Sequence, residues 1–236
     1  MVASLVVGLS CSDDADADDA VPTTATASTA PGVVPPAPST VPPPATTTTL
    51  AGLPLPSVPV SVLIDQLVPA VDAGDEGYAR AQFGVGWVDA DGDGCDTRDE
   101  VLIAESVSPA EVDPSGCVVL AGDWVSPYDG HATPDPSELE VDHVVDLAEA
   151  WRSGAWAWTP ERRVAYANDL DNPGTLVAVT AATNRSKRDR DPTSWQPPDG
   201  DSWCAYAAAW AQTKTTWGLT ADPGEVAALR AITISC

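Results

Sequence analysis

The first quarter of this 236-residue chain has no aromatic residue. All nine tryptophans, all four tyrosines and the single phenylalanine, Phe83, follow residue 60. Residues 12–60 also lack lysine and arginine and consist mainly of Asp, Ala, Thr and Pro. Such a segment buries too little apolar area to offset the entropy of ordering it, so we expect a disordered linker over 12–60, acting as a stalk or as padding without a mechanical role. Residues 61–236 are then left for one globular domain.

Long hydrophobic runs are absent as well. No apolar run approaches the ~20 residues that a transmembrane helix needs. Residues 1–11, MVASLVVGLSC, form a short apolar segment that resembles the end of a truncated bacterial lipoprotein signal peptide, with Cys11 as the lipidation site. An ordinary secretory signal is the alternative. Either signal predicts an extracellular or cell-surface protein, which meets a membrane only through a lipid on Cys11.

The cysteines show no CxxC spacing, which disfavours a zinc site. Without Cys11, four cysteines remain in a chain that we expect to be exported, so disulfides are the better interpretation. Three pairings are possible. We favour Cys95 with Cys117 and Cys204 with Cys236, because each pair closes a local loop and is worth roughly 3 kcal/mol in the chain-entropy model.

Basic residues are scarce. The chain has 35 acidic and 11 basic residues and a formal net charge of −24. A charge of this sign repels nucleic acid at long range. Any function on nucleic acid must therefore depend on local basic clusters and on a bound metal.

The order of hydrophobic patterns predicts an α+β fold with a small sheet. Strands are expected over 138–147 and 175–180, and the turn residues around 117–130 favour a β-hairpin. Residues 182–190 are a polar helix or a loop. Helices are expected over 61–71, 146–158, 160–170, 203–217 and 222–232, the last opened by Asp222 and Pro223.

Two motifs carry residues suited to chemistry on phosphate. Asp142 and His143 stand side by side in a strand that leads into a helix, and Asn184 follows after one further strand. Hydrolysis of a phosphodiester needs a base that deprotonates water and a divalent cation that stabilises negative charge. Oxygen ligands from Asp and Asn suit magnesium, and a histidine kept off the metal remains available as the base. The structural alternative is a surface acid that caps the helix beside a hydrogen-bonded histidine.

At these residues the sequence resembles the HNH endonucleases with a ββα-metal active site, and among them secreted actinobacterial proteins with a DUF1524-type domain. The resemblance runs from Tyr78 to Cys236 through FGVGWVDADGDGCDTRDEVL, VDHVVDLAEAWRSGA, RRVAYANDL and LVAVTAATNRSKRDRDPTSWQPP. It implies a small antiparallel sheet with a ββα-metal core, surrounded by helices and stabilised by disulfides.

The resemblance also implies roles for individual residues. Asp142 and Asn184 would ligate Mg²⁺ or Mn²⁺, and His143 would be the general base. Asn168 would support the orientation of that histidine, with Asn172 as a nearby competitor. Many members of the family have proline where this chain has an acid after VV, which places an extra charge beside the site. The expected phosphate contacts are Lys187, Arg185 and Arg98.

A second motif, DADGDGCDTRDE, matches the spacing of a calcium-binding loop. The ligands would be Asp89, Asp91, Asp93 and Glu100, with the turn at Gly94. The preceding residues FGVGWV are poor in helix formers, whereas an EF-hand needs an entry helix. Calcium binding, a structural turn beside Cys95, and a direct catalytic role of Asp96 or Arg98 all remain open.

Together these features predict a secreted or surface-anchored, metal-dependent HNH nuclease that hydrolyses phosphodiester bonds in DNA, with RNA as a further substrate. The alternative is a catalytically decayed, calcium-stabilised surface binding lipoprotein. A third possibility is an effector against competing cells, which would use the same chemistry. The expected partner is nucleic acid, and no protein partner is implied by the first two readings.

Overall fold

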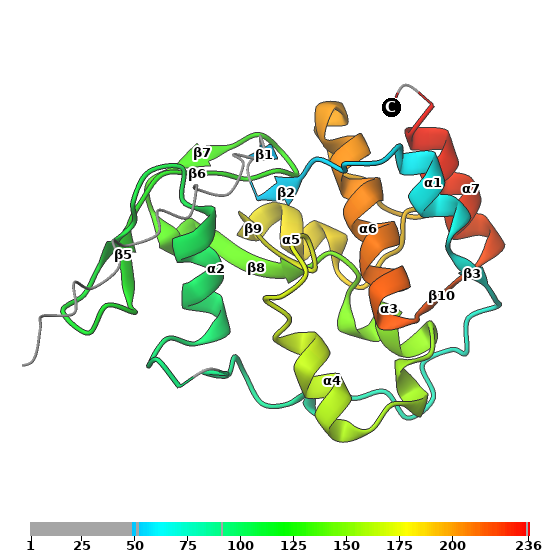
Figure 1. The fold of residues 1–236 in the computed structure, drawn as a ribbon, viewed down its shortest axis with the longest axis horizontal. Helices are drawn as coiled ribbons and strands as arrows, with labels where there is room; N and C mark the ends of the chain where they lie inside the picture. The colour runs from blue at the N-terminus through cyan, green and yellow to red at the C-terminus, as the bar shows by residue number, and fades with distance from the viewer. Residues whose placement is uncertain (1–48, 51, 91, 235) are drawn as a thin grey trace, which may run out of the picture. The chain divides into compact units, whose positions relative to one another are not determined.

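The longest strand pair of the molecule, β8 (Leu139–His143) with β9 (Leu176–Thr180), separates two hydrophobic clusters (Figure 1). The computed structural model describes residues 49–50, 52–90, 92–234 and 236, which belong to a unit that spans residues 45–236. The predicted signal segment 1–11, the lipidation site Cys11, most of the predicted linker and Asp91 lie outside the described residues.

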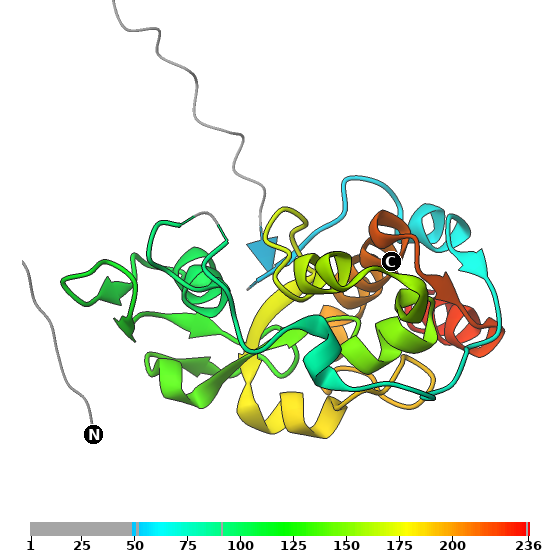
Figure 2. The ribbon, with the colours of Figure 1, turned by 90° about the horizontal axis from the view of Figure 1, so that it is seen from below.

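The two strands are antiparallel, with Asp142 opposite Val177 and His143 opposite Leu176. Side chains alternate between the faces of a strand. Accordingly, Leu139 and Val141 join the cluster under helix α2 (Thr97–Glu105), whereas Val177 and Val179 join the cluster under helix α6 (Trp203–Trp217). All five residues of β9 are buried, as expected for a strand covered on both faces. Helix α5 (Ala181–Lys187) follows β9 directly and lies beside the strand pair (Figure 2).

The other strands form pairs of only two or three residues. Three pairs are antiparallel: β1 (Thr49–Leu50) with β2 (Leu53–Pro54), β4 (Glu111–Val112) with β5 (Val119–Ala121), and β6 (Trp124–Val125) with β7 (Ala132–Thr133). The fourth pair, β3 (Val68–Pro69) with β10 (Thr220–Ala221), is parallel. The α+β class is thus confirmed. The hairpin predicted over 117–130 is wrong. The two strands in this segment do not pair with each other, because β5 pairs with β4 and β6 pairs with β7.

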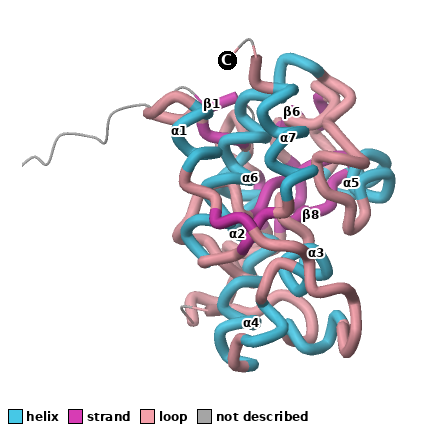
Figure 3. The backbone as a smooth tube through the Cα atoms, turned by 90° about the vertical axis from the view of Figure 1, so that its right-hand side faces the viewer, coloured by secondary structure: helices cyan, strands magenta, loops and turns pink. Residues whose placement is uncertain are grey.

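Three helices pack side by side: α1 (Val60–Asp65), α6 and α7 (Pro223–Ile232) (Figures 1 and 3). Helix α7 begins with a capping box, in which Asp222 and Glu225 each accept from the other's backbone amide. The remaining helices, α3 (Leu147–Arg152) and α4 (Pro160–Ala167), connect β8 to β9 together with one short 3₁₀ turn, η3 (Ala155–Ala157). None of the helices in the described ranges is long and apolar enough to cross a membrane.

The folded unit extends further toward the N-terminus than the boundary expected at residue 61. Leu53 is fully buried in the larger hydrophobic cluster, and α1 begins at Val60. The helix expected over 61–71 ends early, at Asp65, because the chain then turns into β3, which pairs with β10. A single buried leucine in a proline-rich segment gives no periodic signal, so the sequence pattern assigned it to the linker.

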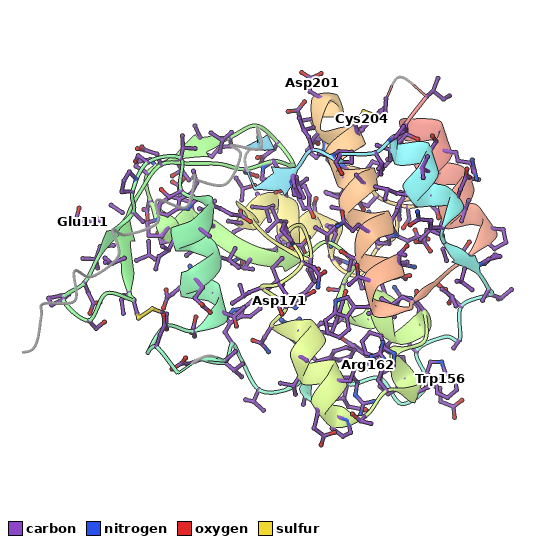
Figure 4. The ribbon with its side chains drawn as sticks, in the orientation of Figure 1. Glu111, Trp156, Arg162, Asp171, Asp201 and Cys204 are labelled. Atoms are coloured by element: carbon purple, nitrogen blue, oxygen red, sulfur yellow. A yellow bond between two sulfur atoms is a disulfide. The ribbon has the colours of Figure 1, made fainter. Side chains whose placement is uncertain are left out.

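Both predicted disulfides are present. Cys95 pairs with Cys117 and Cys204 with Cys236, across sequence separations of 22 and 32 residues. The first joins the loop before α2 to the segment before β5. The second ties the first turn of α6, where Figure 4 labels Cys204, to the C-terminus. These links agree with an extracellular protein.

Glu105, at the end of α2, is a carboxyl group whose surroundings favour the protonated form. Its Oε2 accepts a hydrogen bond from the Ala178 amide at 2.8 Å, and a side chain at Gly52 would collide with it. Burial raises the pKa of Glu105 to about 8, and the Ala178 hydrogen bond acts in the opposite direction. The folded protein therefore holds a proton here that the unfolded chain releases near its ordinary pKa.

We expect stability to fall between about pH 5 and pH 8 on account of Glu105, because a raised pKa in the folded state stabilises only the protonated form. Glu105→Gln keeps an acceptor for Ala178 and cannot ionise. It should therefore flatten this decline and raise the unfolding free energy at pH 8 by on the order of 2 kcal/mol. Urea unfolding at pH 5 and pH 8 measures the difference. Glu138→Gln, at an exposed position, is the matched control, and an equal decline in wild type and Glu105→Gln contradicts the assignment.

Candidate active site

The carboxyl end of β8 presents Asp142 and His143 to opposite faces of the strand pair. Asp142 lies on the same face as Glu140 and faces α5, whereas His143 follows Val141 on the other face. Both side chains are 4% exposed. The adjacent acid and histidine therefore have separate environments.

Asp142 is held by two buried side chains. The Lys187 ammonium contacts its Oδ1 at 3.0 Å and its Oδ2 at 2.9 Å, and the Tyr128 hydroxyl donates to Oδ2 at 2.7 Å. Burial raises the pKa of Asp142, and the charge of Lys187 and both hydrogen bonds act against that rise. Lys187 also donates to the backbone carbonyl of His143 at 2.9 Å, so it fixes the end of β8 as well as the carboxylate.

The His143 ring stacks with two aromatic rings. Trp87 stacks on it with centroids 5.4 Å apart and an interplanar angle of 15°, and Tyr166 lies 6.0 Å away at 30°. Its Nε2 is 2.9 Å from the carbonyl oxygen of Ala167. A carbonyl can only accept, so the hydrogen-bond pattern assigns the proton to Nε2. In the neutral ring, Nδ1 then carries the free lone pair.

A cavity of about 60 Å³ borders the histidine, which is enough space for water. Burial lowers the pKa of His143 to about 3, against the raising effect of the Ala167 hydrogen bond, and the positive charges of Arg80 and Lys187 lower it further. The ring is therefore neutral at pH 7 and able to accept a proton. The cavity is lined by Arg80, Phe83, Gly84, Gly86, Trp87, His143, Leu147 and Ala167.

Asn168 contacts the neighbours of His143. Its Oδ1 accepts from the Val88 amide at 3.1 Å, and its Nδ2 donates to the Val164 carbonyl at 2.9 Å. The first bond holds the residue next to Trp87, and the second fixes the end of α4, where the Ala167 carbonyl lies. The geometry thus gives Asn168 a way to orient the histidine through both of its partners. The competitor Asn172 instead donates to Asp169.

Asn184, the second predicted metal ligand, lies on α5 one turn before Lys187. Its Nδ2 donates to Glu140 Oε2 at 2.8 Å, and Arg185 donates to Glu140 Oε1 at 2.6 and 3.0 Å. Helix α5 therefore contacts β8 at two successive acids on one face. Glu140 was not predicted, although its alternation with Asp142 along the strand is a usable signal.

The donor types around Asp142 and Asn184 suit a hard divalent cation. The Asn184 amide donates to Glu140 from Nδ2, so Oδ1 is the atom of this side chain that can ligate a metal. An ionised carboxylate has about four lone-pair positions. On Asp142, three of these face Lys187 and Tyr128. By chemical type, Asp142 and Asn184 can each supply one oxygen to an ion whose other ligands are water or phosphate, which is a usual arrangement for Mg²⁺.

Lys187 is not placed for the predicted contact with phosphate. Its side chain is fully buried and its ammonium is used by Asp142 and His143, because Thr183 and Lys187 share the inward face of α5. Arg185 is 75% exposed and pairs with Glu140, so it stays accessible. Arg98 donates to the Pro136 carbonyl at 3.2 Å and lies 3.8 Å from Asp99, both away from the histidine cavity.

Asp146, the acid after VV that was expected to add a charge beside the site, begins α3 as its N-cap. Its Oδ1 accepts from the Ala148 amide at 2.7 Å. The strand-to-helix turn thus forms by side-chain capping. Burial raises the pKa of Asp146, and Lys187 acts against that rise.

The predicted calcium loop is described except for Asp91. Asp89 accepts from the amides of Gly92 and Gly94, at 2.8 and 3.1 Å, and Asp93 accepts from the Cys95 amide at 2.8 Å. Asp93 also lies close to both sulfurs of the Cys95–Cys117 disulfide. Among the described residues, this is the one group of three His, Cys, Asp or Glu side chains whose ligand atoms lie close enough together to hold a metal ion. Because oxidised cysteines offer no thiolate, this cluster gives no separate site. Calcium binding stays a prediction.

If the loop binds calcium, millimolar calcium should raise the melting temperature by several degrees. Ligand binding to the folded state adds about 2.7 kcal/mol at a hundredfold excess over Kd. Asp91→Ala or Glu100→Gln should abolish the increase in melting temperature. Neither substitution should have the effect expected of His143→Ala. Thermal unfolding from micromolar to ten millimolar calcium tests this, and a melting temperature that never responds leaves the loop as a disulfide-anchored turn.

The sequence analysis missed residues from two places, the segment before α2 and the loop after β6. Arg80 and Trp87 line the cavity of His143, and Tyr128 bonds Asp142. They come from 3₁₀-helix η1 (Arg80–Phe83) and from loops, so neither periodicity nor motif spacing marks them.

Comparison with known proteins supports a nuclease-like family. Residues 96–231 match the family model described as GmrSD restriction endonucleases, C-terminal domain. An uncharacterized secreted protein of Arthroderma benhamiae is 40% identical over 161 residues, covering 68% of this chain and 76% of the relative. No solved structure matches the chain. These matches are coarser than the HNH, DUF1524-type and actinobacterial resemblance drawn from the motifs.

Proposed function

Because the chain belongs to the family of GmrSD restriction endonuclease C-terminal domains, we propose that it is a secreted, metal-dependent nuclease that hydrolyses phosphodiester bonds in DNA. RNA is a further candidate substrate. We take β8, β9 and α5 as its ββα core, within the folded unit that spans residues 45–236. The relative described as secreted and the two disulfides support an extracellular location.

The observation that carries this proposal is the state of His143. Its neutral ring is held by the hydrogen bond of Nε2 to the Ala167 carbonyl and by stacking with Trp87 and Tyr166, which leaves Nδ1 for a proton, and a water-sized cavity borders the residue. In hydrolysis, the water oxygen bonds to phosphorus, His143 Nδ1 takes the water proton, and the bond from phosphorus to the leaving sugar oxygen breaks. An anionic phosphate near the ring raises the pKa of His143 toward neutrality, which makes it a stronger base.

Asp142 and Asn184 would hold the metal, Mg²⁺ or Mn²⁺. When bound, the metal stabilises negative charge on the phosphate and on the leaving oxygen. Lys187 and Tyr128 position the Asp142 carboxylate, and Asn168 positions both partners of His143. Exposed Arg185 is the member of the predicted basic set that remains available to the nucleic-acid backbone.

Digestion of plasmid DNA by the full chain tests the proposal. We expect nicking or degradation with magnesium or manganese, and none with a chelator. Parallel reactions with calcium and with an RNA substrate define the metal and substrate range. A folded protein that cleaves neither DNA nor RNA with any of these metals contradicts the proposal.

One observation favours a second function, that of a catalytically decayed surface binding protein. The Asp142 carboxylate is 4% exposed and already carries a buried ammonium, so metal access is restricted. A lipid on Cys11 and calcium in the 89–100 loop would belong to this reading. It predicts that magnesium leaves the melting temperature unchanged, whereas the nuclease proposal predicts an increase that Asn184→Ala removes.

A further inference from the structure

Arg80 lies in the wall of the His143 cavity and is not part of the segment that matches the family model, which begins at residue 96. The residue opens η1, and its side chain is exposed to solvent. The lining of the cavity therefore includes a buried base and an exposed cation. Because the chain has a net charge of −24, a positively charged side chain beside the candidate base is unusual for this protein.

The guanidinium of Arg80 has no hydrogen-bond or ion-pair partner within the part of the chain that the structure describes. Most other arginines do have partners: Arg152 contacts Asp75, Glu149 and Asp189, and Arg230 contacts Asp65. Arg80 therefore keeps its fork of donors available for a ligand. A guanidinium fork matches two oxygens of a phosphate group.

Contacts with the hydrophobic core and two hydrogen bonds fix the backbone that carries Arg80. Phe83, at the end of η1, is 2% exposed within the larger hydrophobic cluster. The Gln82 carbonyl accepts from the buried Arg163 side chain at 3.1 Å, and the Gln82 side chain donates to the Gly77 carbonyl. Only the Arg80 side chain has to be ordered when a ligand binds, which limits the entropic cost.

We propose that Arg80 binds a non-bridging oxygen of the phosphodiester on which His143 acts, and so positions the phosphorus beside the nucleophilic water. This assignment rests on the nuclease proposal and adds to it a phosphate-binding residue from outside the matched family segment. It replaces the predicted role of Lys187, which is buried on Asp142. The positive charge also stabilises the additional negative charge that the phosphate gains as water attacks.

The test compares Arg80→Ala and Arg80→Lys with Arg230→Ala, an exposed arginine on α7 that is paired with Asp65. On a short duplex with magnesium, Arg80→Ala should lower kcat/KM on the order of 10- to 100-fold, as for a lost charge-assisted hydrogen bond. Arg80→Lys should recover part of the loss, and added guanidinium should partly rescue Arg80→Ala. Arg230→Ala should match the wild type.

A binding measurement separates this inference from the nuclease proposal. With His143→Ala as background and a chelator present, fluorescence anisotropy of labelled duplex should show weaker binding when Arg80→Ala is added and no change with Arg230→Ala. Wild-type cleavage with an unaffected Arg80→Ala overturns the Arg80 role alone. Absent wild-type cleavage overturns the nuclease proposal, and equal duplex binding with and without Arg80 then overturns the phosphate contact as well.

Discussion

Replacing His143 with alanine is expected to lower the rate of DNA cleavage by about 10²- to 10⁴-fold, the usual contribution of a general base. The ring is the neutral base that borders the cavity, and its Nδ1 has the lone pair that a water proton needs. Single-turnover cleavage of a labelled duplex with saturating magnesium measures the chemical step. His131→Ala is the matched control, because His131 is the only other histidine and its side chain is 54% exposed.

Loss of the ring also removes its stacking with Trp87, so a folding defect has to be separated from a chemical one. Circular dichroism and the melting temperature report the fold. The space left by His143→Ala accepts imidazole, and added imidazole should restore part of the activity in proportion to its neutral form. Cleavage by His143→Ala at the wild-type rate would assign the base to another group.

Much of the fold follows from local sequence signals. The helix over 203–217 and the capped helix that starts at Pro223 were predicted within a residue of their bounds, because alanine-rich periodicity and the Asp222 cap act locally. Strand β9 was predicted because the short apolar run in TLVAVT is typical of a buried strand, and all five residues of β9 are buried. The two-residue pairs, such as β3 with β10, could not be predicted, since so few residues carry no periodicity and the partner lies far along the chain.

The candidate site also has a part that local sequence signals predict and a part that they do not. The motifs placed Asp142 and His143 in a strand and Asn184 in a polar helix or loop, and the three residues lie on β8 and α5. Contacts made across the fold were out of reach: Tyr128 on Asp142, Trp87 on His143, and the position of Arg80 depend on loops whose paths are set by tertiary packing. The burial of Lys187 was not predicted, because a charged side chain in a polar segment is usually solvated. Here Lys187 lies four residues after Thr183 on α5, so both side chains are on the buried face of the helix.

Lys187→Met is expected to lower the free energy of unfolding by about 3–5 kcal/mol, because it leaves the Asp142 carboxylate buried without its cation. The neighbouring Arg185→Ala removes an exposed ion pair with Glu140 and should change stability by less than about 1 kcal/mol. The two substitutions remove one positive charge each from α5, so they form a matched pair. Urea unfolding monitored by tryptophan fluorescence measures both.

The double variant Asp142→Asn with Lys187→Met identifies the cause. It removes both charges and keeps an acceptor for the Tyr128 hydroxyl, so most of the lost stability should return if the uncompensated carboxylate is the reason for the loss. Binding of labelled duplex provides the opposing test. If Lys187 contacts phosphate, Lys187→Met should keep the wild-type unfolding free energy and weaken duplex binding. If Lys187 is instead the buried partner of Asp142, Lys187→Met should lower the unfolding free energy and leave duplex binding unchanged. Arg185→Ala should then weaken duplex binding at unchanged stability.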